Sequence, residues 1–347
     1  MKKVLVIILV FLVLIAGGAA FVGMNYIKGL DKAFDPSNET VTMLEIPAGS
    51  STGDIGAILE EAGIIQSAKK FQLYSRIHKL DSGYMAGTYG FSPSMKLSQI
   101  AEDLTTGRTS TVQFTVPEGL NINELADTLS SQGMGSYEKF LELAANGDFD
   151  YDFLKDAPEG VHRLEGYLFP ETYTMPYGCT EYDILDTMLS HFDQMYTDEY
   201  KARAKELGLT TNEVITIASI IEEECALDEE RPLVSSVIYN RLDLDMPLGM
   251  DSTILFILGE HRYEVTYAET EIDSPYNTYL YPGLPIGPIS SPGLASIEAA
   301  LYPAETDLLY FVVSDKGDGS MVYSNNYEDF ISAVDAFDQY LNEQNND

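Results

Sequence analysis

Cysteine, histidine and tryptophan are scarce or absent in this sequence of 347 residues, which contains two Cys, four His and no Trp. Cys179 and Cys225 are too few for a disulfide framework, and neither belongs to a C-x-x-C pair; the sequence leaves open whether they pair with each other. The four histidines are scattered without the spacing of metal ligands. A disulfide-rich fold and a structural zinc site are therefore not expected.

Positive charge is also scarce. The chain has 20 Lys and Arg against 55 Asp and Glu, and its formal net charge is −35 at pH 7. Proteins that bind nucleic acids neutralise phosphates with clustered Lys and Arg, and the sequence contains no such cluster. Nucleic-acid binding is therefore not expected, whereas an acidic surface of this kind keeps a protein soluble.

Only one long apolar run occurs, and it covers residues 4–24 without a charged residue. About 20 apolar residues cross the hydrocarbon core of a bilayer, so we predict a transmembrane helix there. Lys2 and Lys3 place the tail, residues 1–3, in the cytoplasm and the rest of the chain on the extracytoplasmic side of the cell membrane. The alternative is a cleaved signal peptide, because residues 16–20 are small.

A degenerate repeat follows a polar linker at residues 25–40. The segment IPAGSSTGDIGAILEEAGI (46–64) aligns with VPEGLNINELADTLSSQGM (116–134), and a shorter echo occurs at 97–107. In both full copies a strand-like run meets Pro-x-Gly and then a helical pattern that ends at Gly. Two such units are too few for a solenoid, so they are glycan-binding modules, spacers or a packing scaffold.

The rest of the chain mixes helical and strand patterns. A helical pattern covers about 182–207, a Gly- and Pro-rich segment 276–293, a buried strand 308–314 and an amphipathic helix 327–341. Helices and short strands in separate runs indicate an α+β fold rather than a doubly wound sheet. With 45% hydrophobic residues, the chain is long enough for two or more domains.

Three consecutive glutamates end a strongly apolar helical pattern. Thr210 and Glu213 form a capping-box pattern, so the helix is expected to begin there. Because successive helical residues are about 100° apart, Glu222 shares a face with small and apolar residues, Glu223 faces a polar strip and Glu224 lies opposite Glu222.

The three glutamates are therefore not equivalent. A carboxyl group held against apolar side chains keeps its proton to higher pH, and neighbouring acids add to this effect. Glu222 would then serve as a general acid near neutral pH. The alternative is that the run only marks the point where a buried helix emerges into solvent.

Five motifs occur in a fixed order: LEGYLFPETY (164–173), ASIIEEE (218–224), VSSVIYNRL (234–242), MPLGMDST (246–253) and SPYNTYLYPGLPIGPISSPG (274–293). Together they resemble the YceG-like, or MltG-type, family of endolytic murein transglycosylases, and the similarity covers nearly the whole exported chain. The resemblance implies a LysM-like module at residues 41–108. It also implies a transglycosylase domain at 109–343, which includes a second strand-helix repeat at 109–175.

The resemblance implies a lyase that cuts nascent peptidoglycan strands between MurNAc and GlcNAc and so limits their length. The implied enzyme needs no metal or organic cofactor and works with membrane-bound cell-wall synthases. Its catalytic residue would be the first acid after Ala-Ser-Ile-Ile, which is Glu222. This residue would protonate the glycosidic oxygen and then take the proton of the muramic 6-hydroxyl, which attacks the anomeric carbon and leaves a 1,6-anhydro end.

Hydrolysis, in contrast, normally needs a second carboxylate. Asp251 is the candidate, and its alternative role is to cap a helix that starts at Ser252.

The same resemblance suggests residues that bind substrate. Asn240 and Arg241 would either bind the sugar N-acetyl groups or anchor the Gly/Pro-rich loop. Four further candidates lie in an irregular segment, where binding residues are common: Tyr276, Asn277, Thr278 and Tyr279. Tyr would supply the aromatic surface in a chain without Trp. Arg163 and Glu165 are either part of the site or structural.

Three other functions stay open. The first is a non-catalytic, membrane-tethered protein that only binds peptidoglycan, and the second is a muramidase-type hydrolase that leaves reducing ends. The third, a pyridoxal-phosphate lyase, needs a reactive lysine in a cofactor pocket. Lysines are sparse after Lys79 and mostly lie in polar helical patterns, which disfavours this third function.

Overall fold

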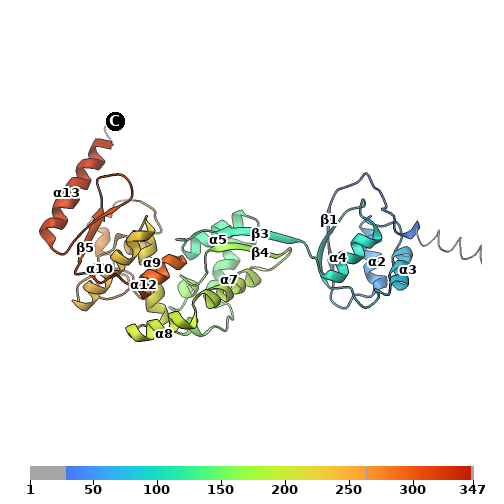
Figure 1. Ribbon diagram of the computed structural model, residues 1–347, viewed down its shortest axis with the longest axis horizontal. Helices are drawn as coiled ribbons and strands as arrows, with labels where there is room; N and C mark the ends of the chain where they lie inside the picture. The colour runs from blue at the N-terminus through green and yellow to red at the C-terminus, as the bar shows by residue number, and fades with distance from the viewer. Residues whose placement is uncertain (1–28, 263–264, 345–347) are drawn as a thin grey trace, which may run out of the picture. The chain divides into compact units, whose positions relative to one another are not determined.

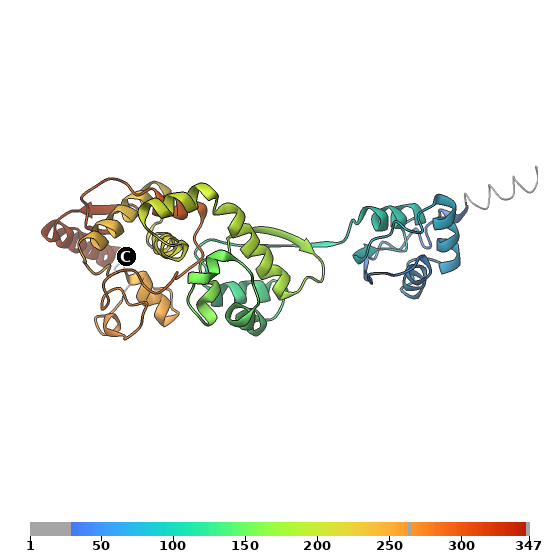
Figure 2. The same ribbon diagram turned by 90° about the horizontal axis from the view of Figure 1, so that it is seen from below.

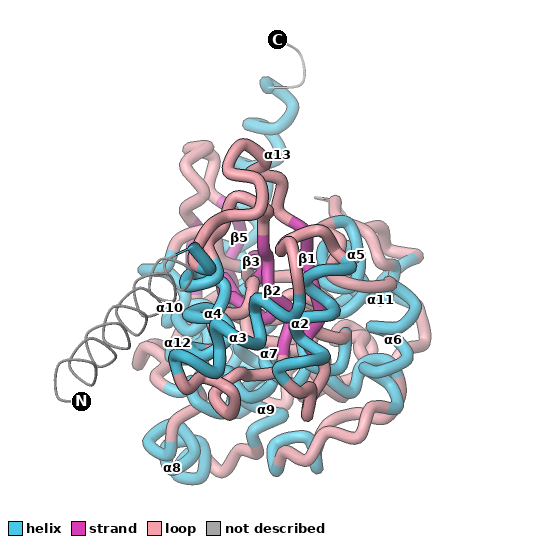
Figure 3. The backbone as a smooth tube through the Cα atoms, turned by 90° about the vertical axis from the view of Figure 1, so that its right-hand side faces the viewer, coloured by secondary structure: helices cyan, strands magenta, loops and turns pink. Residues whose placement is uncertain are grey.

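The computed structural model describes residues 29–262 and 265–344. Helices and loops make up most of this part of the chain, and the strands are short (Figure 3). The predicted α+β class is therefore confirmed. No helix within the described residues combines the length and the apolar character that a bilayer crossing requires. The predicted transmembrane helix, residues 4–24, lies outside the described residues.

The chain divides into two compact units. The first comprises the residues up to Gln113 together with Thr174–Cys179, and the second comprises Phe114–Tyr173 and Thr180–Asp347. Two strands, β3 and β4, contribute residues to both units. The functional division that the sequence suggests stays a prediction.

The first unit has the order strand, helix, helix, strand, helix (Figure 1). Its elements are β1(Thr42–Ile46), α2(Thr52–Glu61), α3(Ala68–His78), β2(Gly87–Phe91) and α4(Leu97–Thr106). The two strands are antiparallel, with Leu44 opposite Tyr89. Fully buried side chains from all five elements form one core: Ile46, Ile55, Leu59, Phe71, Tyr89, Phe91, Ile100 and Leu104.

The second unit contains nine of the α-helices in the described residues: α5(Ile122–Ser131), α6(Tyr137–Asn146), α7(Glu181–Met195), α8(Asp198–Leu207), α9(Thr211–Glu224), α10(Arg231–Asp243), α11(Asp251–Leu258), α12(Leu294–Leu301) and α13(Tyr327–Gln344). Four 3-10 helices connect them: η1(Asp152–Asp156), η2(Val161–Leu164), η3(Asp228–Glu230) and η4(Glu269–Glu271). The strands pair as β3(Thr111–Val116) with β4(Glu171–Pro176) and as β5(Tyr310–Val313) with β6(Met321–Ser324).

Helix α9 is the central element of this second unit. It packs against α12 and α10, and it also contacts α8 and α11 (Figure 1, Figure 2). Every residue from Val214 to Ile221 is buried, which explains why the sequence is apolar on nearly all sides of this helix. Helix α13 packs against the β5–β6 hairpin. The last turn of α9 follows this buried stretch and carries three acids, Glu222, Glu223 and Glu224.

The two copies of the repeat have the same local geometry. In each, a strand leads to a glycine with positive φ, +80° at Gly49 and +79° at Gly119, and then to a helix that begins with a capping box. A second glycine with positive φ follows each helix, +70° at Gly63 and +76° at Gly133. Because glycine adopts this conformation at low cost, backbone geometry explains all four aligned glycines.

The helical pattern predicted over about 182–207 is two helices rather than one. Helix α7 ends at Met195, and α8 begins after Thr197, whose hydroxyl accepts a hydrogen bond from the Tyr200 N–H at 3.4 Å. Thr197 followed by two acids is a helix-start signal that the apolar periodicity obscured. The capping box predicted at Thr210, in contrast, is confirmed.

Candidate active site

The last turn of α9 directs its three glutamates into different surroundings. The capping box fixes where the helix starts, and the chain leaves the helix at Cys225, which has extended backbone angles. Because the three side chains are about 100° apart, they face different neighbours, as the sequence predicts. The neighbours of the Glu222 carboxyl differ from the prediction.

Glu222 belongs to what we call the Arg231 cluster: Glu222, Arg231, Gly293 and Ser296. The Arg231 guanidinium lies 3.3 Å from both carboxylate oxygens of Glu222. The Gly293 N–H and the Ser296 hydroxyl donate to Oε2 at 2.9 and 2.8 Å. Each partner of the ion pair has only 8% of its side chain exposed. The prediction that apolar side chains surround the Glu222 carboxyl is therefore wrong, because its oxygens are occupied by donors.

Gly293 also explains part of the motif that precedes α12. A Cβ atom at this position would meet the carboxyl group of Glu118, so a side chain here would require Glu118 to move. Burial, and then the charge of Glu222, raise the pKa of Glu118. The Pro-Glu-Gly turn of the second repeat copy thus packs directly beside the Arg231 cluster.

Glu224 belongs to a second group, which we call the Glu224 cluster: Glu224, Arg241, Asp251, Ser252 and Tyr279. The carboxyl of Glu224 accepts a hydrogen bond from the Ser252 hydroxyl at 2.7 Å. Burial raises the pKa of Glu224, while the Ser252 hydrogen bond and the Arg241 charge act in the opposite direction. The phenol of Tyr279 donates to Asp251 Oδ1 at 2.5 Å.

A cavity of about 620 Å³ opens beside the last turn of α9. This volume lies within the usual range of ligand pockets. All members of the Glu224 cluster line it, together with Glu223, Asn121, Glu124 and His261. Glu222 is not among the lining residues. The opposite wall is apolar and comes from β5, β6 and α13: Phe311, Val312, Val313, Met321, Phe330, Val334 and Phe337.

Glu223 is the third glutamate of the turn and also lines the cavity. The residue is exposed, but its carboxyl group is enclosed by the cavity wall, and this desolvation raises its pKa to about 7. His261 forms an ion pair with Glu124, which raises the pKa of the imidazole. Several carboxyl groups of differing proton affinity therefore share one cavity.

The structure separates the residues that the sequence proposed for substrate binding. Arg241, Asp251 and Tyr279 line the cavity. Arg241 donates to the carbonyls of Leu309, at 2.6 Å, and Leu248, and its guanidinium stacks 5.2 Å from the ring centre of Tyr310. Asp251 is the first residue of α11 rather than its N-cap, which is Met250.

Four of the proposed binding residues lie outside the cavity lining: Asn240, Tyr276, Asn277 and Thr278. The Asn240 amide donates to the carbonyls of Thr306 and Leu308 at 3.0 and 2.9 Å, so it anchors the segment before β5. The Asn277 amide donates to the Thr270 and Ile272 carbonyls. These contacts support the alternative in which such residues hold loops in place.

Thr278 and Tyr276 are also interior residues. The Thr278 hydroxyl accepts from the Met250 N–H at 2.9 Å and thereby supports the start of α11. Tyr276 is 8% exposed, and its ring lies against His162 and Phe256. Both residues therefore position the cavity wall without reaching its surface.

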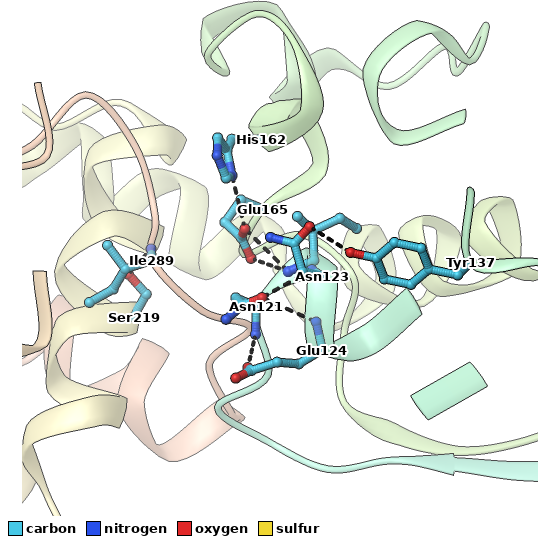
Figure 4. A network of polar contacts seen from close by, with 9 residues as sticks. Asn121, Asn123, Glu124, Tyr137, His162, Glu165, Ser219 and Ile289 are labelled. Atoms are coloured by element: carbon cyan, nitrogen blue, oxygen red, sulfur yellow. Dashed lines mark hydrogen bonds and ion pairs between the residues drawn. The ribbon is translucent and has the colours of Figure 1, made fainter. Parts of the chain in front are cut away.

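Arg163 and Glu165 have structural contacts as well. Arg163 donates to the Gly147 carbonyl at 2.7 Å. Glu165 is 1% exposed and accepts from the Ile122 N–H at 3.0 and 3.2 Å, with His162 at 3.3 Å (Figure 4). Burial raises the pKa of Glu165. A buried carboxyl thus holds the beginning of α5, which carries two cavity residues.

Cys225 lines the cavity beside Glu224 and has a free thiol. Burial raises its pKa to about 12, so the thiol stays protonated and unreactive near neutrality. No group of three His, Cys, Asp or Glu side chains in the described part of the chain has an arrangement that would hold a metal ion.

Sequence reasoning missed several of the cavity residues. Asn121 and Glu124 were visible only as members of the second repeat copy, and nothing in the sequence showed that α5 starts at the cavity. Ser252 was visible only as the expected start of a helix, and His261 had no signal in the sequence. Glu224 was recognised as one of three acids on the helix, but the catalytic role was assigned to Glu222 on the opposite face.

The chain has clear similarity to known proteins. The family model described as the YceG-like family matches residues 44–336. The chain is 35% identical over 343 residues to the endolytic murein transglycosylase of Bacillus subtilis (strain 168), covering 95% of this chain and 93% of that protein.

Two further relatives extend this result. The endolytic murein transglycosylase of Streptococcus pneumoniae serotype 2 is 34% identical over 356 residues, covering 94% of this chain and 64% of that protein. The crystal structure of a yceG-like protein from Listeria monocytogenes is 34% identical, with a TM-score of 0.57, and the match covers 84% of this chain and 99% of that one.

Proposed function

The chain belongs to the YceG-like family, and we propose that it is a membrane-anchored endolytic murein transglycosylase, a lyase that acts on peptidoglycan. The proposed reaction cleaves the MurNAc–GlcNAc bond of nascent glycan strands, leaves 1,6-anhydroMurNAc ends and limits strand length. One observation carries the proposal: the last turn of α9 presents a desolvated carboxyl group to a cavity of about 620 Å³ in a chain whose relatives carry this name.

The geometry favours Glu224 as the general acid. Its carboxyl lines the cavity and is desolvated, and Ser252 alone holds it by hydrogen bonds, through its hydroxyl and its backbone N–H. Glu222, the residue that the sequence suggested, has both oxygens held by donors from Arg231, Gly293 and Ser296. A carboxylate with these partners is not free to approach a substrate. The assignment to Glu222 stays a prediction, which matched variants test.

Glu224 is suited to both steps of the proposed reaction. Desolvation favours its protonated form, which would give its proton to the glycosidic oxygen as the bond to the anomeric carbon breaks. The resulting carboxylate is stabilised by the Ser252 hydroxyl and by the charge of Arg241. It would then take the proton of the muramic 6-hydroxyl as that oxygen attacks the anomeric carbon. The acid ends protonated, and no water is consumed.

A muramidase-type hydrolase is the second candidate, because Asp251 is another carboxyl group in the same cavity. Hydrolysis by two carboxylates needs one of them as nucleophile or as the base that activates water. In this structure Tyr279 donates to Asp251, which stabilises the carboxylate but also reduces its freedom to attack. This contact favours the transglycosylase reaction, in which the nucleophile belongs to the substrate.

The first unit supports a role in binding the glycan. Residues 41–108 have the order strand, helix, helix, strand, helix with antiparallel strands, and we propose that they form the LysM-like module. The apolar run at 4–24 is proposed as a single-pass anchor that keeps the cavity on the extracytoplasmic side. From this position the enzyme would reach strands beside membrane-bound cell-wall synthases, which are its proposed partners.

A digestion experiment tests the proposed function. Full-length protein in detergent is incubated with uncrosslinked glycan strands, and the fragment ends are determined by mass spectrometry. The proposal predicts soluble fragments with 1,6-anhydroMurNAc ends, and it predicts none from the Glu224→Gln variant. Reducing ends would show a muramidase. Glycan binding without any cleavage by the parent protein would show a non-catalytic peptidoglycan-binding protein.

A further inference from the structure

Asn121 caps α5 through its side-chain oxygen, and its side-chain NH₂ group takes no part in the cap. Its side-chain oxygen accepts from the backbone N–H groups of Asn123, at 3.0 Å, and Glu124, at 3.1 Å. Both partners are backbone donors, so the atom that faces them must be the oxygen, and the NH₂ group must point the other way. Among the described residues, no hydrogen bond uses this NH₂ group.

The free amide group belongs to the cavity surface. Asn121 lines the cavity that also contains Glu223 and Glu224. In Figure 4 its side chain lies on the side of α5 that faces Ser219 and Ile289, and Ile289 is another lining residue. Two N–H donors are therefore available to a molecule bound in the cavity.

The surrounding structure holds Asn121 in place. The turn before it exchanges two backbone hydrogen bonds of 2.9 Å with Ser291, one through Gly119 and one through Leu120. On the other side, the buried Glu165 carboxylate accepts from the Ile122 N–H (Figure 4). A polar group fixed from both sides loses little freedom when it binds a ligand, which favours specific recognition.

The first repeat copy shows that capping alone does not require an amide. The equivalent N-cap there is Ser51, whose hydroxyl accepts from the Asp54 N–H in the same capping-box arrangement. Ser, Asp and Asn are comparable N-caps, because each provides an oxygen acceptor. The additional donors of Asn121 therefore need another explanation.

We propose that Asn121 determines specificity by donating a hydrogen bond from its amide to the acetamido carbonyl of an N-acetylated sugar; this inference rests on the proposed function. The acetamido carbonyl is the strongest neutral acceptor that such a glycan offers. Two acids of the wall, Glu124 and Glu223, are poor donors when ionised and repel anionic ligands, and the imidazole of His261 is already paired with Glu124. A neutral carbonyl is thus the group that an amide donor at this position recognises.

The test compares two substrates and two variants. Glycan strands are used fully N-acetylated and after removal of the acetyl groups, and kcat/KM is measured with the full-length protein. Asn121→Asp keeps the capping oxygen but replaces the donors by a carboxylate. Asn121→Ser also keeps a capping oxygen and adds no charge, so it separates the loss of the donor from the gain of a negative charge.

The parent protein is expected to prefer the N-acetylated strands by about tenfold or more, since a site built to hydrogen-bond a group rejects a substrate that lacks it. Asn121→Ser should reduce this preference by about tenfold, mainly through KM. Asn121→Asp should reduce it further, because its carboxylate attracts the ammonium group of the deacetylated sugar. Unchanged preference in both variants would overturn the inference and leave the proposed function standing.

A matched control addresses stability. Thr180 caps α7 with a capping box and does not line the cavity. Thr180→Ala should lower the unfolding midpoint and leave the substrate preference unchanged. If Thr180→Ala altered the preference as much as the Asn121 variants do, the inference would be wrong. If the parent protein cleaved neither substrate, the proposed function would fail, and the inference with it.

Discussion

The Arg231 cluster and the Glu224 cluster contain the same kinds of residue and use them differently. Each pairs a glutamate of the last turn of α9 with a serine and an arginine. In the Arg231 cluster the guanidinium contacts the carboxylate at 3.3 Å. In the Glu224 cluster the guanidinium of Arg241 is held by backbone carbonyls and by the ring of Tyr310.

The difference shows how one helix turn can serve both folding and chemistry. A buried carboxylate with a paired arginine and two further donors is fully satisfied, and its contacts join α9 to α10 and α12. A carboxyl that is desolvated but has a single hydroxyl partner has a raised pKa and can change its protonation state during a reaction. Incomplete satisfaction of Glu224 is therefore what makes it the better candidate for proton transfer.

The largest expected difference between the clusters is in turnover. Glu224→Gln should lower kcat by about 10²- to 10⁴-fold, the usual contribution of general acid–base catalysis, without changing the fold. Glu222→Gln, assayed at a temperature where it stays folded, should retain kcat within about tenfold. Initial rates of fragment release measure both. If Glu222→Gln were folded and inactive while Glu224→Gln stayed active, the general acid would be Glu222 and not Glu224.

The second expected difference is in stability. Glu222→Ala leaves the buried Arg231 guanidinium with only the exposed Asp228 as an acidic partner, at 3.0 Å, so the loss in the free energy of unfolding should lie at the lower end of about 3–5 kcal/mol. Replacing both partners, with Glu222→Leu and Arg231→Met, should cost much less, because no charge is left unpaired. Urea unfolding at equilibrium measures the three proteins. Equal losses in the single and double variants would contradict a paired structural role.

A smaller effect is expected outside both clusters. Asn240→Ala removes the donors that hold the carbonyls of Thr306 and Leu308. It should lower the free energy of unfolding by about 1 kcal/mol, because the two carbonyl acceptors are only partly buried and water can replace part of the lost bonds, while KM stays unchanged. Urea unfolding and steady-state kinetics on the same preparation separate the two quantities. A raised KM with unchanged stability would return Asn240 to the binding site.

The smallest effect concerns the pH dependence of stability at Glu223. Folding raises the pKa of this carboxyl from 4.5 to about 7. The folded state then holds the proton more tightly, so the associated stability is complete below pH 4.5 and is lost as the pH rises through 7. Glu223→Gln should therefore gain stability relative to the parent between pH 5 and 8. The residue is exposed, so solvent screening limits the gain to about 1 kcal/mol.

Unfolding of both proteins at the two pH values checks this prediction. A variant whose stability relative to the parent falls over this range would show that Glu223 is held as a carboxylate.

Local features of the structure were predictable from the sequence, and long-range ones were not. The start of α9 at Thr210, the glycine geometry of both repeat copies and the order of strands and helices follow from signals within a few residues. The partner of Glu222 is nine residues away on the next helix, and the partners of Asn240 lie after residue 300. Neither pairing can be predicted from the local periodicity of apolar residues in the sequence.

The same reasoning explains why the predicted surroundings of the Glu222 carboxyl were wrong, while its catalytic assignment stays a prediction. Helical angles correctly separated the three glutamates, but the face of α9 that looks apolar in sequence receives polar groups from Arg231, Gly293 and Ser296. Which of the three glutamate carboxyls is desolvated depends on the other elements that pack against α9. The direction of a side chain could be derived from the helix, whereas what it meets depended on the whole fold.

The most direct test of the central claim is the titration of Glu224 itself. Isotope-edited infrared spectra of the parent protein, with the spectra of Glu224→Gln subtracted, give the carboxyl signal of this residue as a function of pH. The account predicts a midpoint above the ordinary value of 4.5, because burial raises the pKa. A midpoint at or below 4.5 would show a solvated carboxylate and would contradict the role of Glu224 as proton donor.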